Sequence, residues 1–549
     1  MSIIRPLLIN RTLNNYVKQG GDFEALNAAS LLILTTLLTE AVLQVFNLRI
    51  TNLLGQNIVR DLRNQVYKHV IHLKNSYFDN TPVGTIVTRT ISDIESLSDM
   101  FSEGFIVITG DIIMLIVFII AMFWNNWVLA ILALSTIPLL FVATALFKRG
   151  VKTTFTMVRN AVAELNTFTQ EHITGMRIVQ LFNKEKQEYE KFKVINEKHR
   201  IANIKSIFYY SVFFPVVDIL SSVSIALVIW FAGVKTNSLN IGLGDITFFI
   251  MMVNMMFRPI RMIADRLNTL QMGIVSAERV FKVLDTNEEM EDTGIMEFKT
   301  VNDKIELRNV WFAYRDENYV LKNISLSIRA GETVALVGST GAGKSTIINL
   351  LSRFYEYDKG EILIDGHNIR EYSLESLRLN TGVVLQDVHL FNDTVYNNIT
   401  LNNTNITLNK VIEATKQIGL YDFIMALPDG FNYRVTERGQ GLSAGQRQLI
   451  AFIRAYVYKP GVFILDEATA TIDTNTERLI QLASERISAG RTSIIIAHRL
   501  STIRNVNRIF VFENGEIIEQ GSTKELLALK GKFKKLYDSQ FATENALQA

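Results

Sequence analysis

The chain has 549 residues, no cysteine, seven histidines and a formal net charge of +2. The lack of cysteine excludes disulfides, thiolate metal sites and cysteine catalysis, and the nearly neutral charge gives no sign of a nucleic-acid partner. The composition changes near residue 285, from long apolar runs to an ordinary soluble mixture. We therefore expect a membrane domain over 1–284, an acidic linker over 285–303 and a soluble domain over 304–549.

The first part contains five segments that are long and apolar enough to cross a bilayer, which takes about 20 residues. They lie at roughly 26–48, 104–124, 127–147, 207–232 and 244–266. Asn125 and Asn126 form a tight turn between two of them, whereas the stretches 49–103 and 148–206 are long and charged. We expect each long stretch to form two helices that leave the membrane and return.

Most lysines and arginines of this part lie in the two long stretches, and the short loops have almost none beyond Lys235. The positive-inside rule therefore places both long stretches in the cytoplasm, for a multi-pass protein of the cell (inner) membrane. Five spans then place Met1 outside, and the polar residues 1–25 do not resemble a signal peptide. We expect one further apolar span to be encoded upstream of Met1.

Four ionisable residues fall near the middle of apolar segments, where charge is expensive: Glu40, Asp111, Asp218 and Arg258. Such groups usually face a cavity or pair with another helix. Pairing of Asp218 with Arg258 or Arg261 and contact with a transported substrate remain equally open here.

The second part opens with a phosphate-binding pattern. An apolar strand at 333–337 leads into a glycine-rich turn and a helix, through Gly338, Ser339, Thr340, Gly341, Ala342, Gly343, Lys344, Ser345 and Thr346. Glycines let backbone N–H groups approach a phosphate chain closely. Lys344 supplies a charge for the β- and γ-phosphates and the Ser345 hydroxyl suits Mg²⁺, so the pattern predicts binding of ATP with Mg²⁺.

Three further strands end in polar residues. Val462–Asp466 is apolar and ends in a carboxylate suited to Mg²⁺, and Glu467 follows it as a candidate general base. His498 ends another strand and suits a γ-phosphate oxygen, and Gln386 ends a third, where it suits Mg²⁺ or the attacking water.

A second anion-binding pattern lies at Ser443, Ala444, Gly445 and Gln446, directly before a helix at 448–455. A helix N-terminus with free N–H groups and a serine hydroxyl can bind a phosphate. Because the chain already has one γ-phosphate site, this second pattern suggests use in trans, across a dimer.

Taken together, these motifs resemble those of ATP-binding-cassette exporter half-transporters, in the same order and over nearly the whole chain. The resemblance implies an α-helical polytopic membrane domain followed by an α/β P-loop NTPase domain. It implies that Tyr314 stacks on adenine, that Asp473 ends the D-loop begun at Ala470, and that residues 436–439 contact the cytoplasmic loops. The loop tips at 78–84 and 183–189 are then expected to touch the ATPase domain. This sequence departs from the family at Ala444, where glycine is usual, and in having five spans rather than six.

The resemblance further implies a dimer with a second half-transporter, identical or homologous, and two ATP molecules at composite interfaces. It predicts ATP-driven export of a small amphipathic substrate, such as a drug or lipid. An ATP-gated channel is the alternative, although the intact Glu467 favours an active ATPase. The apolar first part argues against a soluble DNA-repair or translation ATPase, and the absence of an extra N-terminal domain or cysteine argues against a peptide exporter with a protease domain.

Overall fold

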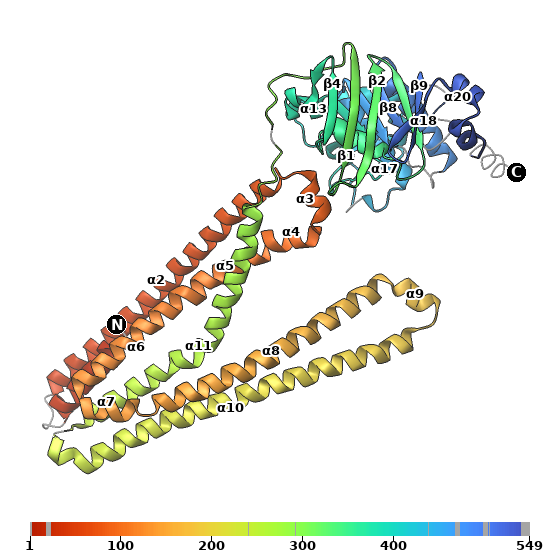
Figure 1. The fold of residues 1–549 in the computed structure, drawn as a ribbon. Coiled ribbons are helices and arrows are strands. Elements are labelled where there is room, and N and C mark those ends of the chain that lie inside the picture. The colour runs from red at the N-terminus through yellow and green to blue at the C-terminus, as the bar shows by residue number, and fades with distance from the viewer. Residues whose placement is uncertain are drawn as a thin grey trace. The chain divides into compact units, whose positions relative to one another are not determined.

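The structure, a computed structural model, describes residues 3–17, 23–239, 241–290, 292–436, 439–466, 473–497, 503 and 506–539. The chain forms two compact units, which are described separately (Figure 1). The first unit comprises 1–71 and 83–287, and the second comprises 72–82 and 288–549.

The regular structure of the first unit's described residues is made up of helices, with no strands. Its elements are α1 (Ile4–Thr12), η1 (Leu13–Val17), α2 (Phe23–Val70), α4 (Val83–Thr90), α5 (Ser92–Asp99), η2 (Met100–Phe105), α6 (Ile106–Asn125), α7 (Trp127–Leu134), α8 (Ile137–Thr174), α9 (Met176–Leu181), α10 (Glu185–Leu239) and α11 (Leu243–Leu284). Among the described residues, five helical stretches are long and apolar enough to cross a membrane, which confirms the five predicted spans. Only helices satisfy all backbone groups within one segment in lipid.

The helices continue far beyond the apolar segments, as predicted for the two long charged stretches. The pair α8 and α10 runs side by side as a long hairpin with α9 at its tip (Figure 1). At the short turn before α7, the Asn126 side chain accepts hydrogen bonds from the N–H groups of Val128 and Leu129, at 3.1 and 3.2 Å. This N-cap explains why two apolar helices are separated there rather than fused.

Some ionisable residues of the first unit form ion pairs between helices. Arg261 lies 2.6 Å from Asp218, which confirms one of the two pairings predicted for Asp218. Arg266 pairs with Asp111. Burial of a lone charge at membrane depth is costly, so each pair lowers the cost of keeping both of its members there.

Polar side chains also fix α1 against the start of α11. Buried Asn10 donates from Nδ2 to Oδ1 of Asp245 at 3.1 Å, and Asn14 donates to Oδ1 of Asn10 at 2.7 Å. The backbone N–H of Gly244 in turn donates to Asn14 at 2.9 Å. The three hydrogen bonds therefore hold α1 in one position on α11.

The second unit contains two sheets. One is antiparallel, in the order β2-β1-β4-β5, and the other runs β10-β9-β3-β8-β7-β6. The strands are β1 (Lys304–Ala313), β2 (Tyr319–Arg329), β3 (Thr333–Gly338), β4 (Lys359–Ile364), β5 (His367–Asn368), β6 (Thr381–Val384), β7 (Val462–Asp466), β8 (Thr492–Ile496), β9 (Arg508–Glu513) and β10 (Glu516–Gly521). In the larger sheet β6, β7, β8, β3 and β9 are parallel, and only β10 is antiparallel.

Helices accompany these strands, so the second unit is α/β, and the predicted fold class is confirmed for both parts of the chain. They are α3 (Asn75–Asn80), α12 (Lys344–Leu351), η3 (Ile369–Glu371), α13 (Leu374–Leu379), α14 (Val395–Thr400), α15 (Leu408–Ile418), α16 (Tyr421–Met425), η4 (Gly430–Asn432), α17 (Ala444–Val457), α18 (Thr474–Ser488) and α20 (Thr523–Leu529). The alternation of strand and helix read from the sequence produces the parallel sheet, because parallel strands need crossover connections.

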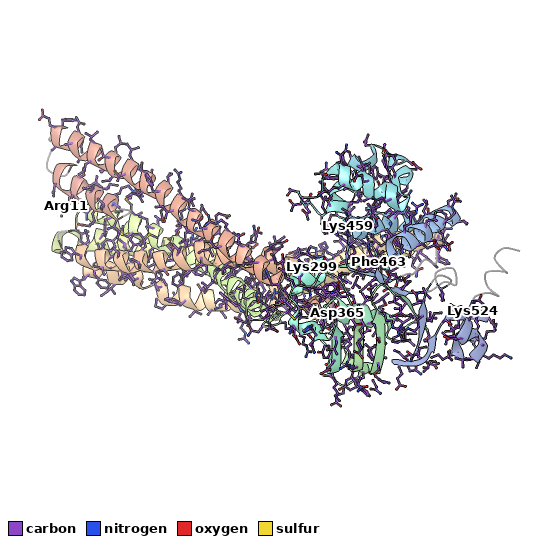
Figure 2. All side chains as sticks on the ribbon, turned by 90° about the horizontal axis from the view of Figure 1, so that it is seen from above. Arg11, Lys299, Asp365, Lys459, Phe463 and Lys524 are labelled. Carbon is purple, nitrogen blue, oxygen red and sulfur yellow. The ribbon has the colours of Figure 1, made fainter. Side chains whose placement is uncertain are left out.

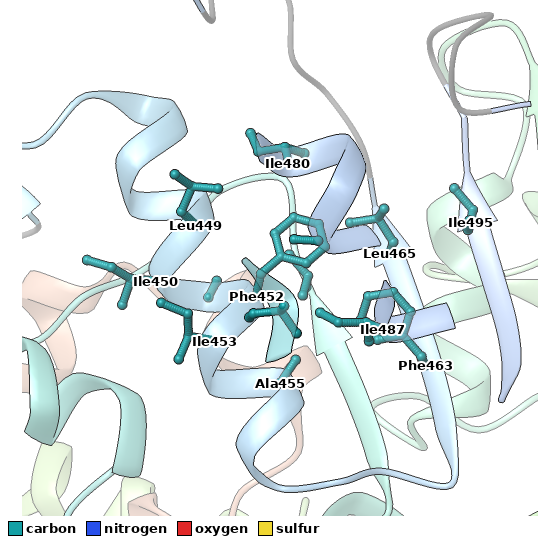
Figure 3. Close-up of a cluster of buried hydrophobic side chains, with 14 of the residues drawn as sticks. Leu449, Ile450, Phe452, Ile453, Ala455, Phe463, Leu465, Ile480, Ile487 and Ile495 are labelled. Carbon is teal, nitrogen blue, oxygen red and sulfur yellow. The ribbon is translucent and has the colours of Figure 1, made fainter. Parts of the chain in front are cut away.

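A hydrophobic core lies between α17, α18 and the larger sheet (Figure 3). Phe452 and Leu449 of α17 meet Phe463 and Leu465 of β7, and all four are buried. Every residue of β7 is buried, as expected for a central strand of a parallel sheet that is covered on both faces. The carboxyl end of β7 therefore has a fixed position.

A single carboxylate holds the backbone at the start of β1. Asp365, in the turn between β4 and β5, accepts backbone hydrogen bonds from Asn302, Asp303 and Lys304 at 2.8–3.1 Å (labelled in Figure 2). The Asp365 side chain thus fixes the backbone of 302–304 to the turn between β4 and β5.

The segment 72–82 belongs to the second unit although it lies between helices of the first. Arg315 donates to Oδ1 of Asn80 at 2.7 Å, and the Tyr355 hydroxyl donates to the carboxylate of Asp79. Burial and this carboxylate raise the pKa of Tyr355. The predicted contact of the tip at 78–84 with the second domain is therefore present at Asp79 and Asn80, whereas contact by the tip at 183–189 stays a prediction.

We expect Phe452→Ala to destabilise the second unit by about 3–5 kcal/mol, because it removes a buried ring and leaves a cavity. The control is Phe391→Ala, since the Phe391 side chain is 58% exposed; its expected cost is within about 0.5 kcal/mol. Thermal unfolding of the purified full chain should shift clearly downward for the first variant alone. Equal shifts for the two variants would contradict the assigned core.

Candidate nucleotide-binding site

The glycine-rich turn joins β3 to α12 at the carboxyl edge of the parallel sheet. Gly341 and Gly343 have φ values of +81° and +99°, a left-handed conformation that side-chain-bearing residues rarely adopt. Gly343 is the N-cap of α12, which begins at Lys344. The predicted strand, turn and helix start are therefore present, and the helix directs its free N–H groups toward the turn.

Lys344 is the central cation of this turn and is only 5% exposed. Its Nζ donates to the carbonyl oxygens of Gly338 and Ser339, both at 2.9 Å. Burial lowers the pKa of Lys344, and the negative charge of Asp466 opposes that shift. A phosphate oxygen entering the turn would meet an ammonium that is already positioned by the loop itself.

Ser345 and Asp466 meet at the same edge. The Ser345 hydroxyl donates to Oδ2 of Asp466 at 3.0 Å, and Asp466 is 7% exposed at the end of β7. A hydroxyl and a buried carboxylate supply the hard oxygen ligands that Mg²⁺ prefers, and Mg²⁺ usually takes few protein ligands together with substrate phosphates. These two residues therefore fit the ion that the sequence predicts.

Two of the remaining predicted residues lie outside the described part of the chain. Glu467 directly follows the end of β7, and His498 lies two residues beyond the end of β8. Gln386 is described, is exposed, and lies two residues beyond β6. Because β6, β7 and β8 are parallel neighbours, all three follow strands that end at one edge of the sheet; their roles stay predictions.

Tyr314 lies beside the phosphate helix. Its hydroxyl donates to Thr346 Oγ1 at 3.2 Å and accepts from Nδ2 of Asn349 at 2.9 Å. Its ring packs edge-on against Tyr355 with centroids 5.0 Å apart, yet the residue remains 41% exposed. An exposed ring held beside the phosphate turn is placed where stacking on adenine is possible, although stacking itself stays a prediction.

Sequence reasoning missed Asn349 and Tyr355 as supports of Tyr314. Thr346 and Asn349 are three residues apart on α12, so they lie on one face of the helix. That spacing would have revealed Asn349 once Thr346 had been placed at the site. Tyr355 follows the helix end and carries no periodic signal.

The helix of the second predicted anion-binding pattern is present, but α17 begins at Ala444, four residues earlier than the predicted start at 448, because Ser443 caps it. Ser443 is the N-cap of α17, and its side chain accepts from the N–H of Gln446 at 3.2 Å, while Gln446 Oε1 accepts from the N–H of Ser443 at 2.9 Å. Ala444 and Gly445 form the first turn, where backbone N–H groups lack intrahelical partners. This capping box gives the helix start a defined geometry.

Two more residues of the predicted motifs, Asp473 and Thr436, make hydrogen bonds to residues close in sequence. The Asp473 carboxylate caps α18 by accepting from the N–H of Thr476 at 3.0 Å, and hydrogen bonds from Thr476 lower its pKa. Thr436 donates to the carbonyl of Gln440 at 2.5 Å. Residues 437–438 and 470–472 lie outside the described residues, so contacts of the D-loop and of residues 436–439 stay predictions.

Comparison with known proteins gives two family matches. Residues 1–260 match the ABC transporter transmembrane region, and residues 321–470 match the ABC transporter family. The chain is 38% identical over 519 residues to an ATP-dependent lipid A-core flippase of Syntrophus aciditrophicus, covering 94% of this chain and 86% of that protein. The chain belongs to the ABC transporter family.

Other relatives place this ABC half-transporter among exporters. It is 36% identical to a probable multidrug resistance ABC transporter ATP-binding/permease protein of Bacillus subtilis, over 90% of this chain and 74% of the relative. The solved structure of a bacterial Atm1-family ABC exporter with ATP bound has a TM-score of 0.80 at 27% identity, over 98% of this chain and 95% of the other. Membrane and nucleotide domains fused in this order are those of exporter half-transporters.

In this ABC half-transporter we expect Lys344→Ala to abolish measurable ATP binding. The substitution removes the cation that would hold the phosphates, and hydrogen bonds to charged groups contribute about 1.5–3 kcal/mol each. The matched control is Lys524→Ala, at an exposed lysine in the first turn of α20. Binding of a fluorescent ATP analogue to the purified full chain measures the effect, and unchanged affinity in Lys344→Ala would contradict the phosphate-turn assignment.

Proposed function

We propose that the chain is one half of an ATP-driven exporter that moves an amphipathic substrate out of the cytoplasm or inner leaflet. Two copies, or this chain and a homologous one, would form the working pump. The observation that carries the proposal is the Lys344–Ser345–Asp466 set, built at one sheet edge in a chain that also has five membrane-length helices.

The dimer is supported by the presence of two separate phosphate-binding elements. The turn before α12 supplies a cation and Mg²⁺ ligands, whereas the capped start of the 14-residue helix α17 supplies backbone N–H groups and the Ser443 hydroxyl. Each bound ATP would contact one phosphate turn and one α17 start. Two chains facing each other would each contribute the turn to one ATP and the α17 start to the other.

The relatives' names support the amphipathic substrate and the direction of transport, because they include a lipid A-core flippase and a probable multidrug resistance transporter. The lysines and arginines of the long stretch 148–206 support a cytoplasmic position for α9 and for those parts of α8 and α10 that extend beyond the bilayer. The nucleotide domain would then lie in the cytoplasm and the spans in the cell (inner) membrane.

The mechanism follows from residues at the sheet edge. Lys344 would hold the β- and γ-phosphates, and Ser345 with Asp466 would hold Mg²⁺, which neutralises phosphate charge when bound. Glu467 would take a proton from the attacking water, with Gln386 and His498 orienting the water and the γ-phosphate. Because ATP binds the closed dimer better than the open one, binding shifts the pump toward closure and hydrolysis reverses the shift.

We expect Glu467→Gln to retain ATP binding and to slow hydrolysis by about 100-fold or more, since a positioned general base typically contributes 10²–10⁴-fold. The control is Glu516→Gln, at an exposed carboxylate of β10. Phosphate release measures hydrolysis, and size-exclusion chromatography should detect an ATP-bound closed dimer of the first variant. Nearly normal turnover would remove Glu467 from the base role.

Export itself is tested in inside-out vesicles that contain the full chain. ATP-dependent uptake of an amphipathic dye is expected for the wild type and for Glu516→Gln, and is expected to fall with hydrolysis in Glu467→Gln. ATP hydrolysis without uptake of any amphiphile, together with an ATP-dependent ion current, would favour a gated channel instead.

Composite sites are tested by mixing two inactive variants. Lys344→Ala damages the phosphate turn and Ser443→Arg damages the start of α17, so a mixed dimer retains one intact composite site. ATPase activity should therefore appear on mixing, provided that subunits exchange and one site can turn over alone. A fluorescence exchange assay monitors mixing, and proven exchange with no recovered activity would contradict independent sites formed in trans.

A further inference from the structure

A cavity of about 610 Å³ lies within the first unit. It is lined by α1, α2, α6 and α11 and is partly open, and its volume falls in the range that holds small ligands or a lipid headgroup. Its charged lining residues are Arg5, Glu40, Asp111, Arg258 and Arg266. Glu40, Asp111 and Arg258 are three of the four ionisable residues that the sequence places near the middle of apolar segments.

The charges of this lining do not cancel. Asp111 and Arg266 form an ion pair with each other. For Arg5, Glu40 and Arg258 the described residues provide no ion pair within 4.0 Å, and Nε of Arg5 is buried without a hydrogen-bond partner there. Two cations therefore face the cavity against one carboxylate, which leaves a positive excess at a depth where charge is expensive.

The position of Arg5 is fixed rather than incidental. Arg5 lies on α1, and the Asn10–Asp245 hydrogen bond, supported by Asn14, holds α1 against the start of α11. Arg258 lies further along the same helix α11. The polar contacts at the end of α1 thus keep both arginines at one cavity.

The remaining lining is mostly apolar and adaptable. It includes Leu37, Ala41, Met114, Phe118, Met255 and Met262. Methionine is flexible and fills irregular space, so such walls accept alkyl chains of varied shape. A positive centre within apolar walls is complementary to a molecule that joins an anionic group to a hydrocarbon chain.

We propose that this cavity binds anionic amphiphiles, with the phosphate or carboxylate group between Arg5 and Arg258 and the alkyl chain along the methionine-rich walls. The inference rests on the proposed export function and narrows its substrate class. Arginine suits this task because its guanidinium remains charged and can bind oxyanions through two parallel hydrogen bonds.

The experiment measures binding of two probes of equal chain length, decyl phosphate and decyltrimethylammonium, to the purified full chain in a nonionic maltoside detergent. Calorimetric titration should detect the phosphate and not the ammonium probe. Arg5→Gln and Arg258→Gln should each weaken decyl phosphate binding by about ten-fold or more, because each removes a charged hydrogen-bond donor. The control Arg60→Gln changes an exposed arginine of α2 that pairs with Asp61 and lies outside the cavity.

Two further variants distinguish a loss of binding caused by the changed charge from one caused by misfolding. Arg5→Lys keeps the positive charge and should recover part of the affinity lost in Arg5→Gln. Glu40→Gln removes the opposing carboxylate and should strengthen decyl phosphate binding, a gain that a misfolded protein cannot produce.

Equal binding of the two probes, or unchanged decyl phosphate affinity in both arginine variants, would overturn the anionic class and leave export standing. ATP-dependent uptake of radiolabelled decyl phosphate into inside-out vesicles is scored separately. Charge-dependent binding in the absence of ATP-dependent uptake of either probe would support the cavity assignment and count against the export function.

Discussion

Parallel pairing of β6, β7, β8, β3 and β9 is the constraint on which the nucleotide site depends. Parallel strands end at the same edge, so the phosphate turn after β3 and the carboxylate at the end of β7 meet although they lie more than 100 residues apart. The register is strict: Leu465 is paired with Ile495 and Asp466 with Ile496. A slip of one residue would turn the Asp466 carboxylate to the opposite face of the sheet and away from Ser345.

Both units follow one rule, that a polar group removed from water needs a partner. In the second unit Lys344 meets this demand with two carbonyl oxygens of its own turn, so the turn is already shaped for phosphate before nucleotide arrives. In the first unit the same rule produces continuous helices and the Arg261–Asp218 pair. At Arg5 the buried Nε has no hydrogen-bond partner among the described residues, and this is why we propose a ligand beside it.

Much of this architecture follows from local patterns. Apolar length predicted five spans, and apolar strands before polar residues predicted β3, β7 and β8. The antiparallel sheet β2-β1-β4-β5 was not predicted, because its two longest strands, β1 and β2, lack the uniform apolar character of the central ones and contain bulges that interrupt their alternation. Partners such as Tyr355 for Asp79 are separated by 276 residues, and no local periodicity identifies contacts of that range.

The second unit is discontinuous, since its 72–82 segment comes from the middle of the helical half of the chain. A fragment beginning at Glu288 would lack Asp79 and Asn80, and would leave Tyr355 and Arg315 without those hydrogen-bond partners. Tyr355 is also the ring against which Tyr314 packs. A nucleotide affinity measured on such an excised domain would therefore be obtained with Tyr314 beside a Tyr355 that has lost its partner Asp79, so domain dissection is a poor route to this protein's energetics.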